Sequence, residues 1–237
     1  MVVPKVSAMS SNLKQRIISA AILAPIVLLI IKVGGGYFAT LVVLMAVIMS
    51  FEWKGIIDHV QKGKKKLTEK QQQVWTAIGV MYVSVFASSL LLLRNIGDGD
   101  DGFDLVLFML LLVWATDIAA YFSGKLIGGP KIWVAISPNK TWAGLLGGMA
   151  AAGLIGIITS FFTSHSFILM FIGGALMAVV AQAGDFFESW VKRKFGVKDS
   201  GNIIPGHGGI MDRMDGFVTV ATVFAFLVLI NDGSFLK

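Results

Sequence analysis

Cysteine is absent from this chain of 237 residues. Its absence excludes disulfide bonds, a thiolate nucleophile and cysteine-ligated metal sites. Charge is also scarce, because charged residues make up 14% of the chain, against about 25% in a typical soluble domain. Hydrophobic residues make up 56%, and their runs follow one another from end to end of the sequence. The composition therefore indicates one integral-membrane domain over residues 1–237 and not a soluble protein.

Seven apolar runs are long enough to cross a bilayer, since a transmembrane helix needs about 20 mostly apolar residues. They cover residues 17–33, 36–53, 74–93, 103–124, 141–162, 166–184 and 216–231. Residues 185–194 extend the sixth run and could form an eighth, half-inserted or interfacial segment. We therefore predict an all-α, polytopic transmembrane helix bundle of about seven to eight spans.

The basic residues are unevenly distributed among the segments that join these runs. With the N-terminus in the cytoplasm, the cytoplasmic segments hold 17 of the 20 Lys and Arg residues, and only Lys32, Arg94 and Lys237 lie outside. Because positively charged loops stay in the cytoplasm, this bias predicts a cytoplasmic N-terminus. The net charge of +6 then reflects topology and an anionic membrane surface, so we expect no nucleic-acid partner.

Charge of both signs is concentrated between the last two runs, in residues 185–215. If the sixth helix continues beyond its apolar run, polar residues at i, i+3, i+4 and i+7 share one face: Asp185, Glu188, Ser189 and Lys192. Residues 206–209, Gly-His-Gly-Gly, form a loop whose backbone N–H groups can line an anion site. Asp212 and Asp215 follow at the start of the last helix. Carboxylates at two helix ends beside a cationic, glycine-rich loop suit a magnesium-bound polyphosphate.

A spaced pattern runs through 25 residues of this segment. It reads Ser189-x-Val191-Lys192-Arg193-x4-Lys198-Asp199-x-Gly201-x2-Ile204-Pro205-x-His207-Gly208-Gly209-Ile210-x-Asp212-Arg213, and Asp215 continues it. The pattern resembles the signature of phosphatidate cytidylyltransferases, also called CDP-diacylglycerol synthases. The resemblance implies transfer of the cytidylyl group of CTP to phosphatidic acid, which gives CDP-diacylglycerol and pyrophosphate. It also implies Mg²⁺ as cofactor with room for a second cation, a homodimer, and a place in a bacterial-type cytoplasmic membrane.

The roles of individual residues follow from the needs of phosphoryl transfer, in which positioning and charge neutralisation dominate. We expect the metal to be held by Asp185 and Asp215, with Asp212 assisting. Phosphate oxygens are expected to be neutralised or hydrogen-bonded by Ser189, Lys192, Arg193, Lys198 and Arg213. The nucleotide loop is expected to be shaped by His207, Gly208 and Gly209, and Asp199 belongs to the same pattern. No general base is required, because a phosphate monoester is already anionic at neutral pH.

A second polar stretch, residues 137–144, precedes the fifth apolar run. It offers hydroxyl and ammonium groups where a helix begins, and helix N-termini bind phosphate through free N–H groups. The substrate-binding candidates here are Ser137, Asn139, Lys140 and Thr141. A helix N-cap with a topology-setting lysine would explain the same residues without a substrate. The stretch is similar to a second motif of the family, Ser-Pro-x-Lys-Thr-x-Glu-Gly, except that Ala143 replaces the usual Glu.

Asp117 is an ionisable residue inside the fourth apolar run. Such a carboxylate costs roughly 2.5–3.5 kcal/mol to insert and usually faces a partner or a wet cavity. A polar stripe follows it on the same helix face, and Lys125 lies just beyond. We expect Asp117 and Lys125 to contribute to substrate binding, together with Lys140 from the facing helix. An ion pair of Asp117 with Lys125 or Lys140 is the structural alternative.

Two further features are expected to be structural. Glu52 lies beside Trp53 at the end of the second run, which predicts an interfacial side chain without a catalytic role. Gly144 and Gly148 form a small-xxx-small pair, which predicts close packing of the fifth helix against a neighbour.

Another class of protein stays open from the residues alone. Intramembrane carboxylates are also typical of secondary transporters and channels, where ionisable residues line a cytoplasm-facing cavity. Against this class, the charges gather near one membrane face instead of the midplane, and no inverted repeat is evident. A CDP-alcohol phosphotransferase would need a different pattern, D-G-x2-A-R-x8-G-x3-D-x3-D, which the sequence lacks.

Overall fold

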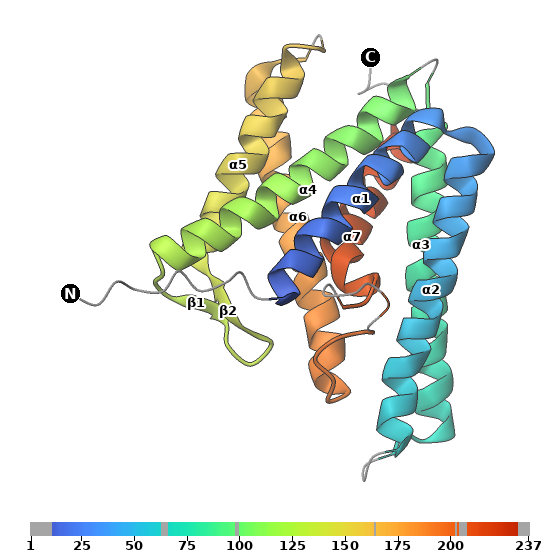
Figure 1. The fold of residues 1–237 in the computed structure, drawn as a ribbon. Helices are drawn as coiled ribbons and strands as arrows, with labels where there is room; N and C mark the ends of the chain where they lie inside the picture. The colour runs from blue at the N-terminus through green and yellow to red at the C-terminus, as the bar shows by residue number, and fades with distance from the viewer. Residues whose placement is uncertain are drawn as a thin grey trace.

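The computed structural model describes residues 11–62, 66–97, 100–163, 165–201, 203 and 208–231, with the backbone alone for residues 11–20 and 62. This part of the chain forms seven helices and one two-stranded sheet (Figure 1). The helices are α1 (Ser11–Val33), α2 (Gly35–Lys62), α3 (Glu69–Arg94), α4 (Asp101–Leu126), α5 (Trp142–Ser160), α6 (Phe167–Lys194) and α7 (Met211–Ile230). The strands are β1 (Lys131–Trp133) and β2 (Ser137–Thr141), between α4 and α5.

Each predicted apolar run corresponds to one helix, so the all-α class is confirmed. The six helices α2 to α7 are long and apolar enough to cross a membrane, whereas the apolar stretch found in α1, Ala21–Val33, is shorter. No separate eighth helix occurs in the described residues, because α6 continues unbroken from Phe167 to Lys194. The segment 185–194 is therefore the polar end of a long helix. The chain is a multi-pass integral membrane protein.

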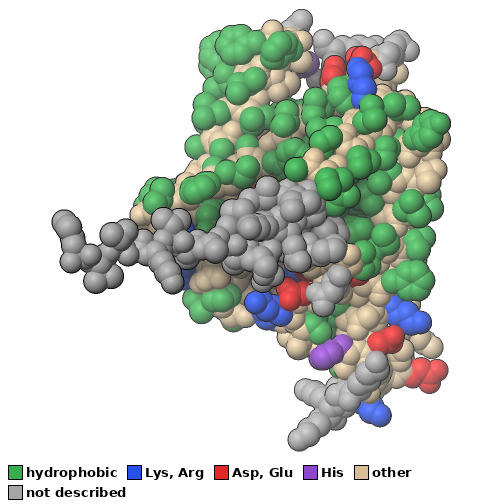
Figure 2. Space-filling model, in the orientation of Figure 1, with side chains coloured by type: hydrophobic (Ala, Val, Ile, Leu, Met, Phe, Trp, Pro, Cys, Tyr) green, Lys and Arg blue, Asp and Glu red, His purple; other side chains and the backbone are tan. Residues whose placement is uncertain are grey.

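The outer surface of the bundle is apolar. Many large hydrophobic side chains are exposed on several helices, including Leu29, Phe51 and Leu169. Figure 2 shows hydrophobic side chains over the middle of the molecule, with charged side chains gathered toward its two ends. Exposed apolar area on this scale is unfavourable in water, and it matches the hydrocarbon core of a bilayer.

Close helix crossings hold α4, α5 and α6 together. A Cβ atom added to Gly144 would lie 2.9 Å from the carbonyl oxygen of Ala120, and one added to Gly148 would lie 3.1 Å from that of Thr116. A side chain at either position would crowd α4, so the predicted close packing of Gly144 and Gly148 is confirmed. On the other side of α6, α7 packs against α3, α4 and α6.

The β-hairpin between α4 and α5 is a feature that the sequence did not predict. Its strands pair antiparallel, with Lys131 opposite Thr141 and Trp133 opposite Ser137. Thr141 then caps α5, because its hydroxyl accepts a hydrogen bond from the N–H of Gly144 at 3.0 Å. The N-cap that the sequence left open as the structural alternative for this stretch is thus present at Thr141. The substrate contacts expected here stay predictions. The hairpin holds residues 137–141 at the same end of the bundle as the end of α6 and the start of α7 (Figure 1).

At the opposite end of the bundle, polar contacts attach α1 to α3 and α4. The Arg94 guanidinium donates hydrogen bonds to the carbonyl oxygens of Ile31 and Lys32, at 2.6 and 3.0 Å. The ammonium group of Lys32 lies 2.6 Å from Asp100. These contacts satisfy carbonyl groups that the last turn of a helix leaves unpaired. They fix the end of α1 while its apolar residues lie along α2 and α4.

Candidate active site

A polar cavity of about 780 Å³ lies where the second half of α4, β2 and the starts of α5 and α7 meet the middle of α6. Its walls carry carboxylates, ammonium groups and a guanidinium group. The predicted site residues that line it are Asp117, Lys125, Asn139, Lys140, Thr141, Asp185, Asp212, Arg213 and Asp215. Residues from the two polar stretches and from the fourth apolar run therefore meet in one place, as the sequence predicted.

Asp185 is held from two sides. Its Oδ2 atom lies 2.6 Å from the Nζ atom of Lys140, and its Oδ1 atom accepts a hydrogen bond from the hydroxyl of Ser189 at 3.2 Å. Lys140 thus pairs with Asp185, and the Lys125 ammonium lies 3.5 Å from the hydroxyl of Tyr121. The sequence left open an ion pair between Asp117 and Lys140, but in the structure Lys140 pairs with Asp185 instead. Ser189, expected to bond a phosphate, here orients the carboxylate one turn before it.

Asp185 and Asp215 are brought together by a close crossing of α6 and α7. A Cβ atom on Gly184 would lie 2.5 Å from the carbonyl oxygen of Asp215, so a larger residue would push the helices apart. Asp117 and Asp215 each repel Asp185, while Lys140 attracts Asp117. Three carboxylates from α4, α6 and α7 therefore share one cavity. Mutual repulsion of this kind favours the binding of a cation between them.

Mg²⁺ is compatible with these donors, although the structure shows no ready-made cage. No group of three His, Cys, Asp or Glu residues with metal-binding geometry occurs in the part of the chain that is described. Such a cage is not needed, because Mg²⁺ is usually held by one or two carboxylates together with water and substrate phosphates. Asp185 and Asp215 offer hard oxygen donors of the right kind. The metal-binding roles of Asp185, Asp212 and Asp215 stay predictions.

Asp212 is engaged in ordering the chain around the cavity. Its Oδ1 atom lies 2.6 Å from the Nζ atom of Lys192. Its Oδ2 atom accepts hydrogen bonds from the N–H groups of Ser200 and Gly209, at 2.9 and 3.0 Å. One carboxylate thus joins α6, the segment after it and the start of α7. Both of its oxygens are used within the protein.

Lys192 lies in a buried network and does not line the cavity. Besides Asp212 it contacts Glu188, whose Oε2 atom lies 3.3 Å from its ammonium group. Lys192 is 8% exposed and Glu188 is 1% exposed, so this is an ion-pair network shielded from solvent. The shared face of Asp185, Glu188, Ser189 and Lys192 on α6 is confirmed. Lys192 neutralises two protein carboxylates, and its predicted contact with substrate phosphate stays a prediction.

Glu52 is buried inside the protein, which corrects the expected interfacial position. It was predicted to lie at the membrane interface, but it is 4% exposed and accepts hydrogen bonds from the N–H groups of Ile210 and Met211, both at 2.8 Å. The hydroxyl of Ser200 donates to it at 3.4 Å. A carboxylate at the N-terminus of α7 satisfies free backbone donors and complements the positive end of the helix dipole. Glu52 is therefore the cap of α7, supplied by α2.

Four further predicted site residues lie outside the cavity lining: Ser137, Arg193, Lys198 and Asp199. The Arg193 side chain is exposed and donates to the carbonyl oxygen of Val197 at 3.0 Å. Lys198 and Asp199 are exposed after the end of α6, and Ser137 is half-buried in β2. The substrate contacts expected of these residues stay predictions.

Gly208 and Gly209 are tightly enclosed. Gly208 has a positive φ of 82°, a backbone conformation that favours glycine. A Cβ atom on Gly209 would overlap the Ser200 hydroxyl and lie 2.8 Å from the carboxylate of Glu52. Both glycines thus allow the loop to close against its supporting carboxylates. His207, expected to shape the same loop, lies outside the described residues.

Some residues of the cavity were missed from the sequence. Gln182 is 6% exposed and lines the cavity from α6, one turn before Asp185. Its position in an otherwise apolar run, three residues before an acid, is a signal that could have found it. Lys131 also lines the cavity, and it donates to the carbonyl oxygen of Asn139 at 3.3 Å. It was missed because the hairpin that brings it there was not predicted.

A membrane helix bundle with a cavity of carboxylates and cations at one end is suited to binding anionic substrates. The chain belongs to the cytidylyltransferase family, whose model matches residues 59–231. This range includes the hairpin, the Asp117 helix and the whole signature segment. It begins after Glu52.

The relatives of this chain carry a more specific name. The phosphatidate cytidylyltransferase of Brucella suis biovar 1 (strain 1330) is 37% identical, with 90% of this chain and 92% of that protein aligned. That of Rickettsia bellii (strain RML369-C) is 34% identical over 92% of this chain and 91% of that protein. That of Staphylococcus haemolyticus (strain JCSC1435) is 42% identical over a shorter stretch, 54% of this chain and 50% of that protein.

Proposed function

We propose that this protein is a phosphatidate cytidylyltransferase, which transfers the cytidylyl group of CTP to phosphatidic acid and releases pyrophosphate. The family and the names of its relatives support this assignment. The observation that carries it in the structure is the polar cavity, where Asp117, Asp185 and Asp215 meet Lys140 and Arg213. A site for two anionic substrates needs such cations, and a site for a metal-bound triphosphate needs such carboxylates.

The reaction requires little covalent chemistry from the protein. An oxygen of the lipid phosphate attacks the α-phosphorus of CTP, the bond from this phosphorus to the bridging oxygen of the β-phosphate breaks, and pyrophosphate leaves. Because the attacking phosphate is already anionic, no side chain has to act as nucleophile or general base. The protein must instead align two anions and neutralise their repulsion.

The cations of the cavity are suited to that task. Lys140 pairs with Asp185, and both Lys140 and Arg213 interact electrostatically with Asp117. We assign these two cations to phosphate oxygens at the reacting centre. Lys125 and Lys131 lie further out in the lining, on α4 and β1, where they can hold the rest of the triphosphate or the incoming lipid phosphate. Arg193 and Lys198, which are exposed near the loop, would draw anionic nucleotides toward the cavity.

Asp185 and Asp215 are the proposed holders of Mg²⁺, which when bound supplies the positive charge that stabilises the triphosphate and the departing pyrophosphate. Ser189 fixes the orientation of Asp185 through its hydroxyl. Asp212 assists from behind, because it fixes the start of α7 and with it the position of Asp215. Glu52 likewise positions the start of α7 by accepting hydrogen bonds from Ile210 and Met211. Lys192 positions Asp212 through their ion pair.

We also propose that the cavity faces the cytoplasm. The excess of Lys and Arg in the segments at this end of the bundle supports that orientation, and CTP is a cytoplasmic nucleotide. Relatives from bacteria support a place in the cytoplasmic membrane. A homodimer stays an expectation from the family.

The test is an assay of the purified protein in detergent with labelled CTP, phosphatidate and Mg²⁺. We expect a CDP-lipid and pyrophosphate in equal amounts, and no product when phosphatidate is omitted. A protein that forms no CDP-lipid but moves an ion or solute across vesicles would instead be a transporter, the alternative that intramembrane carboxylates leave open.

A further inference from the structure

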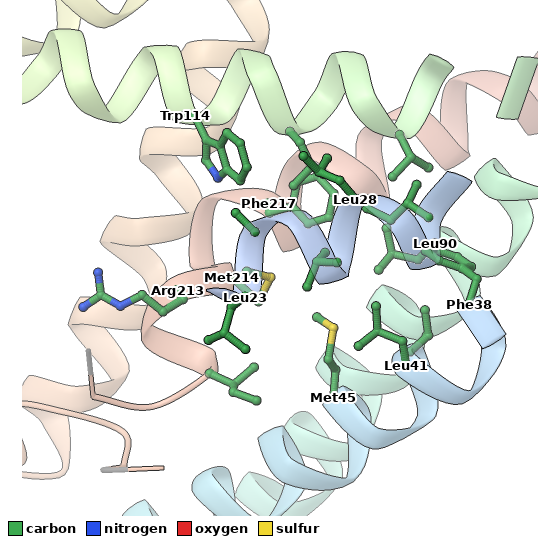
Figure 3. Close-up of a pocket in the computed structure, with 17 residues that line it drawn as sticks. Leu23, Leu28, Phe38, Leu41, Met45, Leu90, Trp114, Arg213, Met214 and Phe217 are labelled. Atoms are coloured by element: carbon green, nitrogen blue, oxygen red, sulfur yellow. The ribbon is translucent and has the colours of Figure 1, made fainter. Parts of the chain in front are cut away.

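A second cavity lies beside the polar one and is almost entirely apolar. It measures about 450 Å³ and is lined by residues of α1, α2, α3, α4 and α7 (Figure 3). Pockets of about 300–1,000 Å³ hold small ligands in proteins, so the space is large enough to matter. Among the residues that the structure describes, Arg213 is its single charged lining residue. We call this space the apolar groove.

The apolar groove and the polar cavity adjoin each other. Trp114, Arg213 and Met214 line both of them. In Figure 3 the guanidinium group of Arg213 points away from the apolar side chains, while Phe38 and Leu90 lie at the far end of the groove. A molecule that filled both spaces would therefore place an anionic group near Arg213 and a hydrocarbon chain between the helices.

The groove is also accessible from the membrane side. Leu23 and Trp114, near the Arg213 end, are 43% and 41% exposed. Deeper in, Val42 and Val106 are each 1% exposed, and Phe38 and Leu90 are 3% exposed. The groove is thus open at one end and closed at the other by packed side chains.

We propose that the apolar groove binds one fatty acyl chain of the lipid substrate while the lipid phosphate lies at Arg213. This inference rests on the proposed function, and it adds where the lipid is bound and what selects it. The occupant is an acyl chain of a glycerophospholipid with an exposed phosphate. Such a molecule matches an anion site and an apolar groove that share Trp114, Arg213 and Met214.

The groove selects by shape more than by hydrophobicity. Lipid tails in the surrounding bilayer are as apolar as the groove, so moving a chain into it gains little from leaving water. Packed helix walls do not expand easily, and each added methylene must find space. The closed end at Phe38 and Leu90 therefore limits the length of acyl chain that fits. The surrounding bilayer imposes no such limit.

The first test changes the depth of the groove. Leu41 lies in the lining on α2, whereas Leu44, on the same helix, is 55% exposed and outside it. Leu41→Trp should lower the ratio of turnover with dioleoyl phosphatidate to turnover with dioctanoyl phosphatidate on the order of tenfold, because overpacking blocks the long chain. Leu44→Trp is the matched control and should keep the parental ratio. An unchanged ratio in Leu41→Trp would overturn the proposal.

The second test uses the unaltered protein, so that its answer does not depend on the folding of a variant. A phosphatidate with a diazirine at the end of one acyl chain is photolysed in proteoliposomes, and labelled peptides are mapped by mass spectrometry. We expect labels at the far end of the groove, near Phe38, Leu41 and Leu90. Unlabelled phosphatidate should compete, and phosphatidylcholine with the same chains should not.

Labels spread over the outer faces of the bundle, or equal competition by phosphatidylcholine, would show ordinary bilayer lipid and overturn the proposal. Labels found only at contacts between two copies of the chain would also overturn the proposal, because a second copy would then occupy the groove. Failure of the proposed function is distinguishable from these results, because the unaltered protein would then form no CDP-lipid with a phosphatidate of any chain length.

Discussion

Glu52 of α2 and Met211 of α7 are joined by a 2.8 Å hydrogen bond across 159 residues of sequence. The same carboxylate accepts from Ile210, so two of the free N–H groups at the start of α7 are satisfied by a different helix. Asp212 and Asp215 lie in the first two turns that follow. A contact outside the cavity lining thus helps to determine where two of the site carboxylates lie.

Glu52→Gln should therefore impair both stability and activity. The amide keeps the size of the side chain but replaces one acceptor oxygen with a donor, which then faces a backbone N–H. Leaving a buried donor unpaired costs about 1–3 kcal/mol, so we expect a lower melting temperature in detergent and a fall in kcat. Glu69→Gln, an exposed change in the first turn of α3, is the control. Parental kcat and melting temperature in Glu52→Gln would contradict the capping role.

Lys192→Met should destabilise the protein strongly. The substitution removes the ion-pair partner of the buried Glu188 and the closest cation of Asp212. Removing one partner of a buried ion pair costs about 3–5 kcal/mol. Thermal unfolding followed by circular dichroism should show a large drop in melting temperature, whereas Lys194→Met, an exposed change two residues on, should have a small effect. Equal stability of the two variants would mean that the buried network does not hold the loop.

Arg213→Ala should lower kcat/KM by about 10- to 100-fold, because hydrogen bonds to charged groups contribute about 1.5–3 kcal/mol. The loss should appear with CTP and phosphatidate alike if Arg213 lies between the two substrates, as its place in both cavities indicates. Steady-state kinetics with each substrate varied in turn measures this, and Lys70→Ala, an exposed change on α3, controls for loss of charge. If Lys70→Ala lowers kcat/KM as much as Arg213→Ala does, the loss reflects overall charge, and Arg213 does not bind the substrates.

Local sequence signals predicted the helices and the position of the site. Apolar runs predicted all seven helices, six of which are long and apolar enough to cross a membrane, because a spanning helix must be both long and apolar. The i, i+3, i+4 and i+7 spacing placed Asp185 and Lys192 on one face of α6 correctly. Helical periodicity depends on neighbours in sequence, so it can be read without knowing the packing.

Contacts between distant segments were not predictable in this way. The pairing of Glu52 with α7 depends on how α2 packs, and nothing near Glu52 in the sequence indicates it. The hairpin was missed because β1 has three residues and its turn lacks the Asn-Gly or Asp-Gly pair typical of tight hairpins. The apolar groove depends on gaps between five elements, which no single run of sequence describes.

Asp185 and Asp215 are proposed to hold one divalent cation together with the triphosphate. The most direct measurement is equilibrium binding of Mn²⁺, as a paramagnetic substitute for Mg²⁺, followed by electron paramagnetic resonance in the presence of CTP. We predict that Asp185→Asn and Asp215→Asn each abolish this CTP-dependent binding and turnover while the helical circular dichroism is retained. Parental Mn²⁺ binding and near-normal turnover in Asp215→Asn would contradict the account.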